Sequence, residues 1–247
     1  MPTVFIADAA CKTHDPGAGH PEQPRRFDAV LEAVQSAGLL EKMTRLATRE
    51  VSADDLRLVH TPEYLELAER EIRAGADVLS TGDTSVAPAS WNAARTAVGS
   101  ALAAVDAVLA GPAQTAFCLV RPPGHHASAG RGMGFCVLNN IAIAARHAQR
   151  RHSVGKVLIV DWDVHHGNGS QDVFYEDGAV FFFSTHQWPW YPGTGRAEET
   201  GSGAGEGTTL NCPLRALSGR KEIFACFEGK LLPAMEKFKP ELVLISA

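Results

Sequence analysis

The sequence lacks the features that mark membrane, secreted and repeat proteins. No apolar run approaches the roughly 20 residues that span a bilayer. The first residues, MPTVFIADAACKTHDPG, contain neither a basic segment nor a long apolar stretch, so we expect no secretory signal. No internal repeat, low-complexity linker or block of like charge is present. We therefore expect a globular protein that does not associate with membranes.

Basic charge and paired cysteines are also scarce. The chain has 23 Lys and Arg against 28 Asp and Glu, which gives a net charge of −5 at pH 7. A nucleic-acid binder usually carries a basic stripe, so we expect no direct nucleic-acid binding. The five cysteines, none of them in a C-x-x-C pair, are Cys11, Cys118, Cys136, Cys212 and Cys226. Their odd number and wide spacing predict reduced, buried thiols in a cytoplasmic protein, not a disulfide framework or a cysteine zinc site.

The sequence does contain an alternation of short apolar runs and helical patterns. Strands are predicted at residues 3–7, 116–120, 156–160, 179–184 and 241–246, and helices at 25–37, 91–110, 138–150 and 222–237. The apolar runs lack polar alternation, which is typical of strands buried on both faces. We predict an α/β fold: an open, doubly wound, mainly parallel sheet flanked by helices, in a single domain over residues 1–247. In such sheets the chemistry gathers at the carboxyl ends of the strands.

The segment VDWDVHHGNG, at residues 160–169, begins where one predicted strand ends. In extended backbone, side chains two apart share a face, so Asp161, Asp163 and His165 are expected to point the same way. Two carboxylates and an imidazole this close favour a bound divalent cation, because unpaired like charges would repel. One nitrogen and several oxygens suit catalytic zinc, with iron, cobalt and manganese as alternatives. A metal-free Asp–His hydrogen bond at the strand end is the structural alternative.

The segment RPPGHHA, at residues 121–127, follows another predicted strand. His125 and His126 are adjacent in a loop that proline and glycine stiffen. The two rings therefore cannot both serve only to fill the hydrophobic core. Imidazoles that titrate near neutral pH suit general acid–base chemistry. Each ring needs a partner to fix its tautomer, and Asp161 and Asn168 are candidates. An ordinary surface loop would also explain the histidine pair taken alone.

Seven motifs follow one another along the chain: HPEQPRR (20–26), HTPEY (60–64), RPPGHHA (121–127), GMGFCVLNN (132–140), VDWDVHHGNG (160–169), YPGTG (191–195) and LNCPL (210–214). In their order and spacing they resemble the histone deacetylase and acetylpolyamine amidohydrolase family, over almost the whole chain. Asn168, where other branches carry aspartate, resembles the class II and bacterial branch. The resemblance implies an arginase/deacetylase-like fold and hydrolysis of an acetylated amine.

The resemblance also implies a zinc centre with one ion per chain. Asp163 and His165 match two of the zinc ligands. The third ligand, an aspartate, and the residue that polarises the acyl carbonyl are expected beyond Ala247, so that on this interpretation the domain is incomplete at its C-terminus. The backbone of Asp161, Asp163 and His165, together with Ser184 and Thr185, resembles the family's monovalent-cation site, which implies bound K⁺.

Catalytic roles follow from the same resemblance. His125, backed by Asp161, and His126, backed by Asn168, match the histidine pair that faces the water activated by zinc. The charge of Asp161 should make His125 the more readily protonated of the two. His126, beside a neutral amide, is then the expected base.

Substrate contacts are implied as well. Phe135, with Gly134 beside it, and Tyr191 match the walls of a narrow tunnel, and an aromatic slot suits the methylene stem of an acyl-lysine. Asp83 matches the residue that holds the substrate backbone at the rim, and Arg26 a residue near an inner acetate pocket. The alternatives are core aromatics for the two rings, a solvated turn for Asp83 and a surface charge for Arg26.

We therefore expect a zinc-dependent deacetylase that acts on acetyl-lysine in proteins or on an acetylated polyamine. A catalytically incomplete relative that binds metal or acyl-lysine is the alternative from another functional class. A manganese-dependent, arginase-like ureohydrolase is disfavoured by the tandem histidines and the DWDVHHGNG segment. The sequence leaves open which acetylated amine is the substrate and whether the chain forms a homo-oligomer.

Overall fold

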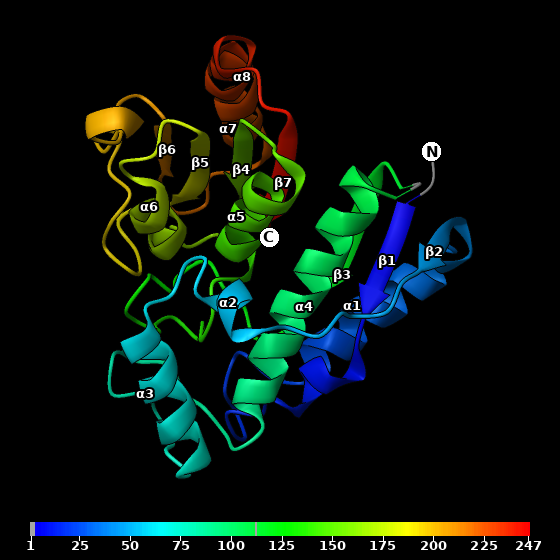
Figure 1. The fold of residues 1–247 in the computed structure, drawn as a ribbon. Coiled ribbons are helices and arrows are strands. Elements are labelled where there is room, and N and C mark those ends of the chain that lie inside the picture. The colour runs from blue at the N-terminus through cyan, green and yellow to red at the C-terminus, as the bar shows by residue number, and fades with distance from the viewer. Residues whose placement is uncertain (1–2, 112) are drawn as a thin grey trace. The chain divides into compact units, whose positions relative to one another are not determined.

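The computed structural model describes residues 3–111 and 113–247. It divides into two compact units, Met1–His152 and Ser153–Ala247, and each is described by itself (Figure 1). Neighbouring strands in the sheets of both units run parallel. None of the helices in the described ranges is long and apolar enough to cross a membrane.

The first unit contains a three-stranded sheet in the order β2-β1-β3. Its strands are β1 (Thr3–Ala7), β2 (Met43–Arg45) and β3 (Thr115–Leu119). Its helices are α1 (Arg25–Ser36), α2 (Ala53–Leu56), α3 (Pro62–Arg73), α4 (Ser90–Leu109) and α5 (Asn140–His152), with short 3₁₀ turns η1 (Ala9–Thr13) and η2 (Leu40–Lys42).

Different helices cover the two faces of this sheet. Phe5 of β1 clusters with Leu119 of β3 and Phe27 of α1. The next residue, Ile6, clusters instead with Ala103 and Ala104 of α4. Because successive side chains of a strand point to opposite faces, β1 lies between α1 and α4. This is the doubly wound arrangement that the sequence predicts.

A second and larger core joins α3, α4 and α5. Leu65 and Ile72 of α3, Leu102 of α4 and Ile143 of α5 are buried in it. The segment that precedes α5 contributes Leu138 to the same cluster. Burying an apolar side chain of this size stabilises the fold by about 1.5–3 kcal/mol, so this core anchors the loops that run from β3 to α5.

The second unit contains a four-stranded sheet in the order β6-β5-β4-β7. Its strands are β4 (Val157–Asp161), β5 (Val180–Gln187), β6 (Thr209–Leu214) and β7 (Leu242–Ser246). Its helical segments are α6 (Asn168–Phe174), η3 (Gly203–Gly205), α7 (Arg220–Cys226), the π-helical η4 (Phe227–Leu231) and α8 (Leu232–Phe238).

One face of the second sheet is covered by the run from α7 to α8. Leu158 of β4 and Phe181 of β5, which are register partners, cluster with Cys226 and Leu231 of that run. On the other face Phe182 contacts the ring of His166, just before α6, at 6.0 Å between centroids. β7 is an edge strand, and its Val243 and Ile245 are 44% and 55% exposed.

The predicted architecture of parallel strands flanked by helices is confirmed, and every predicted strand is present with its ends within a few residues. Several elements differ from the sequence prediction, among them β2 and the short helices α2 and α6, which were not predicted. The helix predicted at 222–237 contains the π-helical η4, directly before Pro233 in the first turn of α8, where proline has no N–H to donate. Helix α3 was not predicted, although Thr61 caps it through the N–H of Tyr64 and Pro62 occupies its first position. The single domain remains a prediction.

Candidate active site

The loop that carries the tandem histidines begins with a buried arginine. Arg121 forms an ion pair with Glu22, in which its Nε donates to Oε1 at 2.7 Å. Its two Nη groups donate to the backbone carbonyls of Cys11 and His14, each at 3.1 Å. A buried charge is tolerated only when it is paired and hydrogen-bonded. These bonds therefore hold the start of the loop against the segment between β1 and α1.

The two histidines that follow are both buried. The ring centroids of His125 and His126 lie 4.0 Å apart at an interplanar angle of 41°, and their side chains are 6% and 3% exposed. A turn closed by the N–H of Ala127 on the carbonyl of Gly124, at 3.0 Å, fixes the backbone around them. The surface-loop alternative for this pair does not fit such burial.

The buried Asn139 holds the loop of the two histidines through hydrogen bonds. Asn139 donates from Nδ2 to the carbonyl of Ala127 at 2.8 Å, and its Oδ1 accepts from the N–H of Ala142 in α5 at 3.0 Å. Its own N–H donates to Nε2 of His60 at 2.9 Å. Sequence reasoning assigned no role to Asn139 or His60. The available signal was a polar residue in an otherwise apolar run, VLNNIAI.

The predicted tunnel residues of the first unit gather at the same loop. Gly134 has φ +59°, and a Cβ at this position would collide with the ring of His126, so only glycine allows this approach. Phe135 also has a positive φ, +69°, and its ring meets that of His20 edge to face at 4.6 Å. Asp83 is exposed, and its Oδ1 accepts from the N–H of Gly134 at 2.8 Å.

Arg26 lies on α1 with a side chain that is 60% exposed. The structure thus places it on the surface of the first unit, where its Nη1 lies 3.8 Å from Oε1 of Glu22.

In the second unit, regular strand ends at Asp161, and residues 163–165 form a bend. The N–H of Asp163 donates to Oδ1 of Asp161 at 3.1 Å, and the N–H of His165 donates to Oδ1 of Asp163 at 2.7 Å. The prediction that Asp161, Asp163 and His165 point the same way assumed extended backbone, whereas residues 163–165 form a bend. Two carboxylate-to-backbone hydrogen bonds, the type that shapes Asx turns, hold the segment instead.

The spacing of two side-chain atoms in this bend fits a metal ion. Nδ1 of His165 lies 3.1 Å from Oδ1 of Asp163, a hydrogen-bonding distance that also fits the metal-free Asp–His alternative. Two nitrogen or oxygen ligands on a tetrahedral zinc ion, with bonds of 2.0–2.2 Å, are separated by about 3.3 Å. Both side chains are about one-third exposed, at 34% and 31%. Asp163 and His165 could therefore hold zinc between them, and other ligands would have to complete its coordination.

The remaining predicted residues of the second unit lie close by. The ring of Tyr191 meets that of His165 edge to face at 5.9 Å. Asn168 is the first residue of α6 and is buried. Ser184 is the register partner of Asp161, and its Oγ lies 2.9 Å from Nδ1 of His186. Thr185 is buried beside it. The K⁺ site at Ser184 and Thr185 stays a prediction.

A polar network in the second unit was missed by sequence reasoning. His166 contacts Thr194 Oγ1 through Nδ1 at 2.8 Å and Gln171 Oε1 through Nε2 at 3.0 Å. Gln171 donates from Nε2 to Glu199 Oε2 at 2.6 Å. Burial raises the pKa of Glu199, but hydrogen bonds from the N–H of Arg196, the amide of Gln171 and the N–H of Gly195 lower it further. The network ties α6 to the YPGTG loop at Thr194. Its members are too far apart in the sequence for a motif to reveal it.

The predicted catalytic pairs, His125 with Asp161 and His126 with Asn168, each join one residue of the first unit to one of the second. They remain predictions, as do the substrate and metal roles of the residues above.

Comparison with known proteins places this chain in a family. The histone deacetylase domain matches residues 20–247. Histone deacetylase 10, chloroplastic, from Oryza sativa subsp. japonica is 41% identical over 92% of this chain and 55% of that protein. Polyamine deacetylase HDAC10 from Rattus norvegicus is 41% identical over 92% of this chain and 40% of that protein. The chain thus spans about half or less of these relatives.

A solved structure supports the same family assignment. The crystal structure of the HDA15 HD domain superimposes with a TM-score of 0.94 at 36% identity, over 100% of this chain and 72% of that domain. The arginase/deacetylase-like fold predicted from the resemblance is therefore confirmed. The chain belongs to the histone deacetylase family, whose members are generally metal-dependent.

The support that His60 gives to the histidine loop predicts a pH dependence of stability. Burial lowers the pKa of His60 from 6.5 to about 4, and Nε2 must stay unprotonated to accept from Asn139. At pH values between these two pKa values, the unfolded chain binds more protons than the folded one. The free energy of unfolding therefore decreases as the pH is lowered. This residue alone should cost about 2 kcal/mol between pH 7.5 and 5. Urea unfolding at both pH values measures it.

In His60→Gln, the amide oxygen can accept from Asn139 but does not titrate. The loss of unfolding free energy between pH 7.5 and 5 should shrink by about 2 kcal/mol in this variant. An unchanged loss would show that His60 is not held neutral.

Proposed function

We propose that this chain carries the zinc-dependent deacetylase chemistry of its family, the hydrolysis of an N-acetyl amide on acetyl-lysine or an acetylated polyamine. The observation that carries the proposal is the 3.1 Å spacing of Asp163 Oδ1 and His165 Nδ1 in the bend that follows β4. The names of the relatives, histone deacetylase and polyamine deacetylase, support both substrate classes. The cytoplasmic location and a homo-oligomeric state remain predictions.

Asp163 and His165 would hold the metal together with further ligands. Zinc, when bound, polarises the acyl carbonyl and makes water a nucleophile at neutral pH. The bend itself supports the ligand role of Asp163. Its Oδ1 is held by the N–H of His165, so the carboxylate keeps one orientation with or without an ion.

The histidine pair would move the protons of the reaction. His126 takes a proton from the attacking water, and the pair then delivers a proton to the leaving amine. Burial and the fixed backbone turn at Ala127 hold the rings in one arrangement. Preorganised groups of this kind need no rearrangement as the reaction proceeds, which is the source of much catalytic power.

Aromatic rings would bind the stem of the substrate. Phe135 and Tyr191 offer apolar faces to the methylene groups of a lysine or polyamine chain. Asp83 is exposed and negatively charged, so it suits a backbone N–H of a peptide or an ammonium group of a polyamine. Its hydrogen bond to Gly134 keeps that carboxylate near Phe135.

Two glycines of one segment provide a matched pair of variants. Gly134→Ala forces a Cβ into the ring of His126, whereas at Gly130 the same Cβ would meet nothing within 4 Å. A misplacement of about 1 Å at a reacting group can cost 10²-fold in rate. We expect kcat for a fluorogenic acetyl-lysine peptide to fall by about 100-fold in Gly134→Ala and to change little in Gly130→Ala. Equal effects of the two variants would argue against His126 as a reacting group.

The proposal itself is tested by zinc content and turnover together. Both are measured on the 247-residue chain, with an acetyl-lysine peptide and an N-acetylated polyamine as substrates. Asp163→Asn keeps the acceptor for His165 but removes a ligand charge. It should remove one equivalent of zinc and more than about 99% of the activity, given the 10²–10³-fold cost of losing one catalytic group.

Asp54→Asn, the same change at an exposed position of α2, is the control and should alter neither zinc content nor turnover. If the folded chain binds zinc or acetyl-lysine but turns over neither substrate, a binding protein replaces the enzyme. If Asp163→Asn keeps full zinc and activity, the metal role of this bend is wrong.

A further inference from the structure

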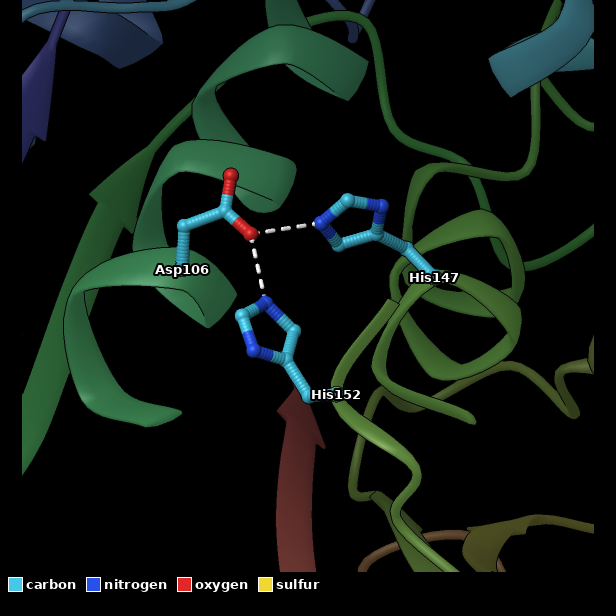
Figure 2. A group of neighbouring side chains, drawn as sticks. All are labelled: Asp106, His147 and His152. Atoms are coloured by element: carbon cyan, nitrogen blue, oxygen red, sulfur yellow. Dashed lines mark hydrogen bonds and ion pairs between the residues drawn. The ribbon is translucent and has the colours of Figure 1, made fainter. Parts of the chain in front are cut away.

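A second group of metal-ligand side chains lies in the first unit, on elements that the proposed active site does not use. Asp106 of α4 and His147 and His152 of α5 converge on one point (Figure 2). Oδ1 of Asp106 lies 2.6 Å from Nε2 of His147 and 2.7 Å from Nε2 of His152. Within the residues that the structure describes, this is the one group of three or more His, Cys, Asp or Glu whose ligand atoms all lie within 4.8 Å.

The burial of the three side chains suits an ion site with one open side. The side chains of His147 and His152 are only 8% and 14% exposed, whereas that of Asp106 is 38% exposed. The two rings meet edge to face with their centroids 5.6 Å apart. Both imidazoles therefore have restricted orientations, and the carboxylate side leaves a path for an ion from solvent.

The electrostatics at the C-terminal end of α4 favour a positive charge. Asp106 lies in the last turn of α4, where the helix dipole already contributes partial negative charge and where α4 has no basic residue. α5 ends at His152, with Arg150 and Arg151 in the same last turn. Burial raises the pKa of Asp106, but the hydrogen bonds from the two histidines and the charge of Arg49 lower it further.

Arg49 forms only a long ion pair with Asp106. Its Nε lies 4.0 Å from Oδ2 of Asp106, too far for a hydrogen bond, and its Nη2 is bound to Asp55 at 2.6 Å instead. A cation shared by the carboxylate and both imidazoles would compensate the negative charge of Asp106 and of the C-terminal end of α4.

We propose that Asp106, His147 and His152 bind a divalent transition-metal ion, zinc by preference, at a site separate from Asp163 and His165. Two imidazoles and one carboxylate are a common zinc donor set and leave a fourth position for water. Binding would replace the protons that now join Asp106 to each histidine. The ligand atoms would move apart from hydrogen-bonding distance to about 3.3 Å. The ion would join the last turn of α4 to the last turn of α5.

The competing interpretation is a carboxylate that only accepts two imidazole N–H bonds, and one substitution separates the two. Asp106→Asn keeps an oxygen acceptor for both rings but removes the charge that a metal ligand needs. Zinc binding is measured by competition with a chromophoric chelator in an Asp163→Asn background, which lacks a ligand of the proposed catalytic site. Asp28→Asn, at an exposed ion pair of α1, is the matched control.

We expect one zinc per chain to remain in the Asp163→Asn protein and in its Asp28→Asn derivative. Asp106→Asn, or His147→Gln with His152→Gln, should weaken that zinc by more than about 100-fold, beyond the loss that a ligand's supporting residue causes. Zinc should raise the Tm of the background protein and not of these variants. Co²⁺ should give tetrahedral visible absorption bands that disappear in the same variants.

The proposal is overturned if the Asp163→Asn protein binds no zinc, or if Asp106→Asn leaves its zinc affinity and the Co²⁺ bands unchanged while the protein stays folded by circular dichroism. Because this readout does not depend on turnover, it is independent of whether the deacetylase function holds. The same Asp106 variants in the otherwise unaltered chain should lower its zinc content by one equivalent.

Discussion

The site in the second unit depends on a carboxylate that is buried at the end of a strand. Asp161 is fully buried on β4, between β5 and β7. Removing a carboxylate from water costs several kcal/mol unless hydrogen bonds or a cation replace the lost hydration. The backbone bends after Asp161, so that the N–H of Asp163 donates a hydrogen bond to Oδ1 of Asp161. That turn places Asp163 and His165 side by side.

The first unit follows the same rule at the end of β3. There the buried charge is Arg121, and its partners are the carboxylate of Glu22 and two backbone carbonyls from the segment after β1. The loop it begins carries two buried histidines; Asn139 holds its backbone at Ala127, and Gly134 packs against the ring of His126. In both units, therefore, a buried charge at the end of a strand fixes the backbone of the segment that carries the predicted site residues. A substitution there should affect folding and activity together.

Much of the fold and of the candidate site could be predicted from the sequence, because the patterns that indicate them lie within short segments. Apolar runs located every predicted strand, and adjacent residues such as His125 and His126 had to lie together whatever the fold. The Pro62 start of α3 was also local and was overlooked. Contacts between distant residues gave no such signal. Asp106 is 41 residues from His147, and only the packing of α4 on α5 brings them within 2.6 Å.

The direct test of the account is a crystal structure of the zinc-loaded protein with anomalous data collected on both sides of the zinc absorption edge. The account predicts a zinc peak bonded to Asp163 and His165 at about 2.0–2.2 Å, with the His126 ring facing it across the space for one water molecule. A peak absent from this bend, or a His126 ring directed away from it, would contradict the assignment of the histidine pair and the metal ligands to one active site.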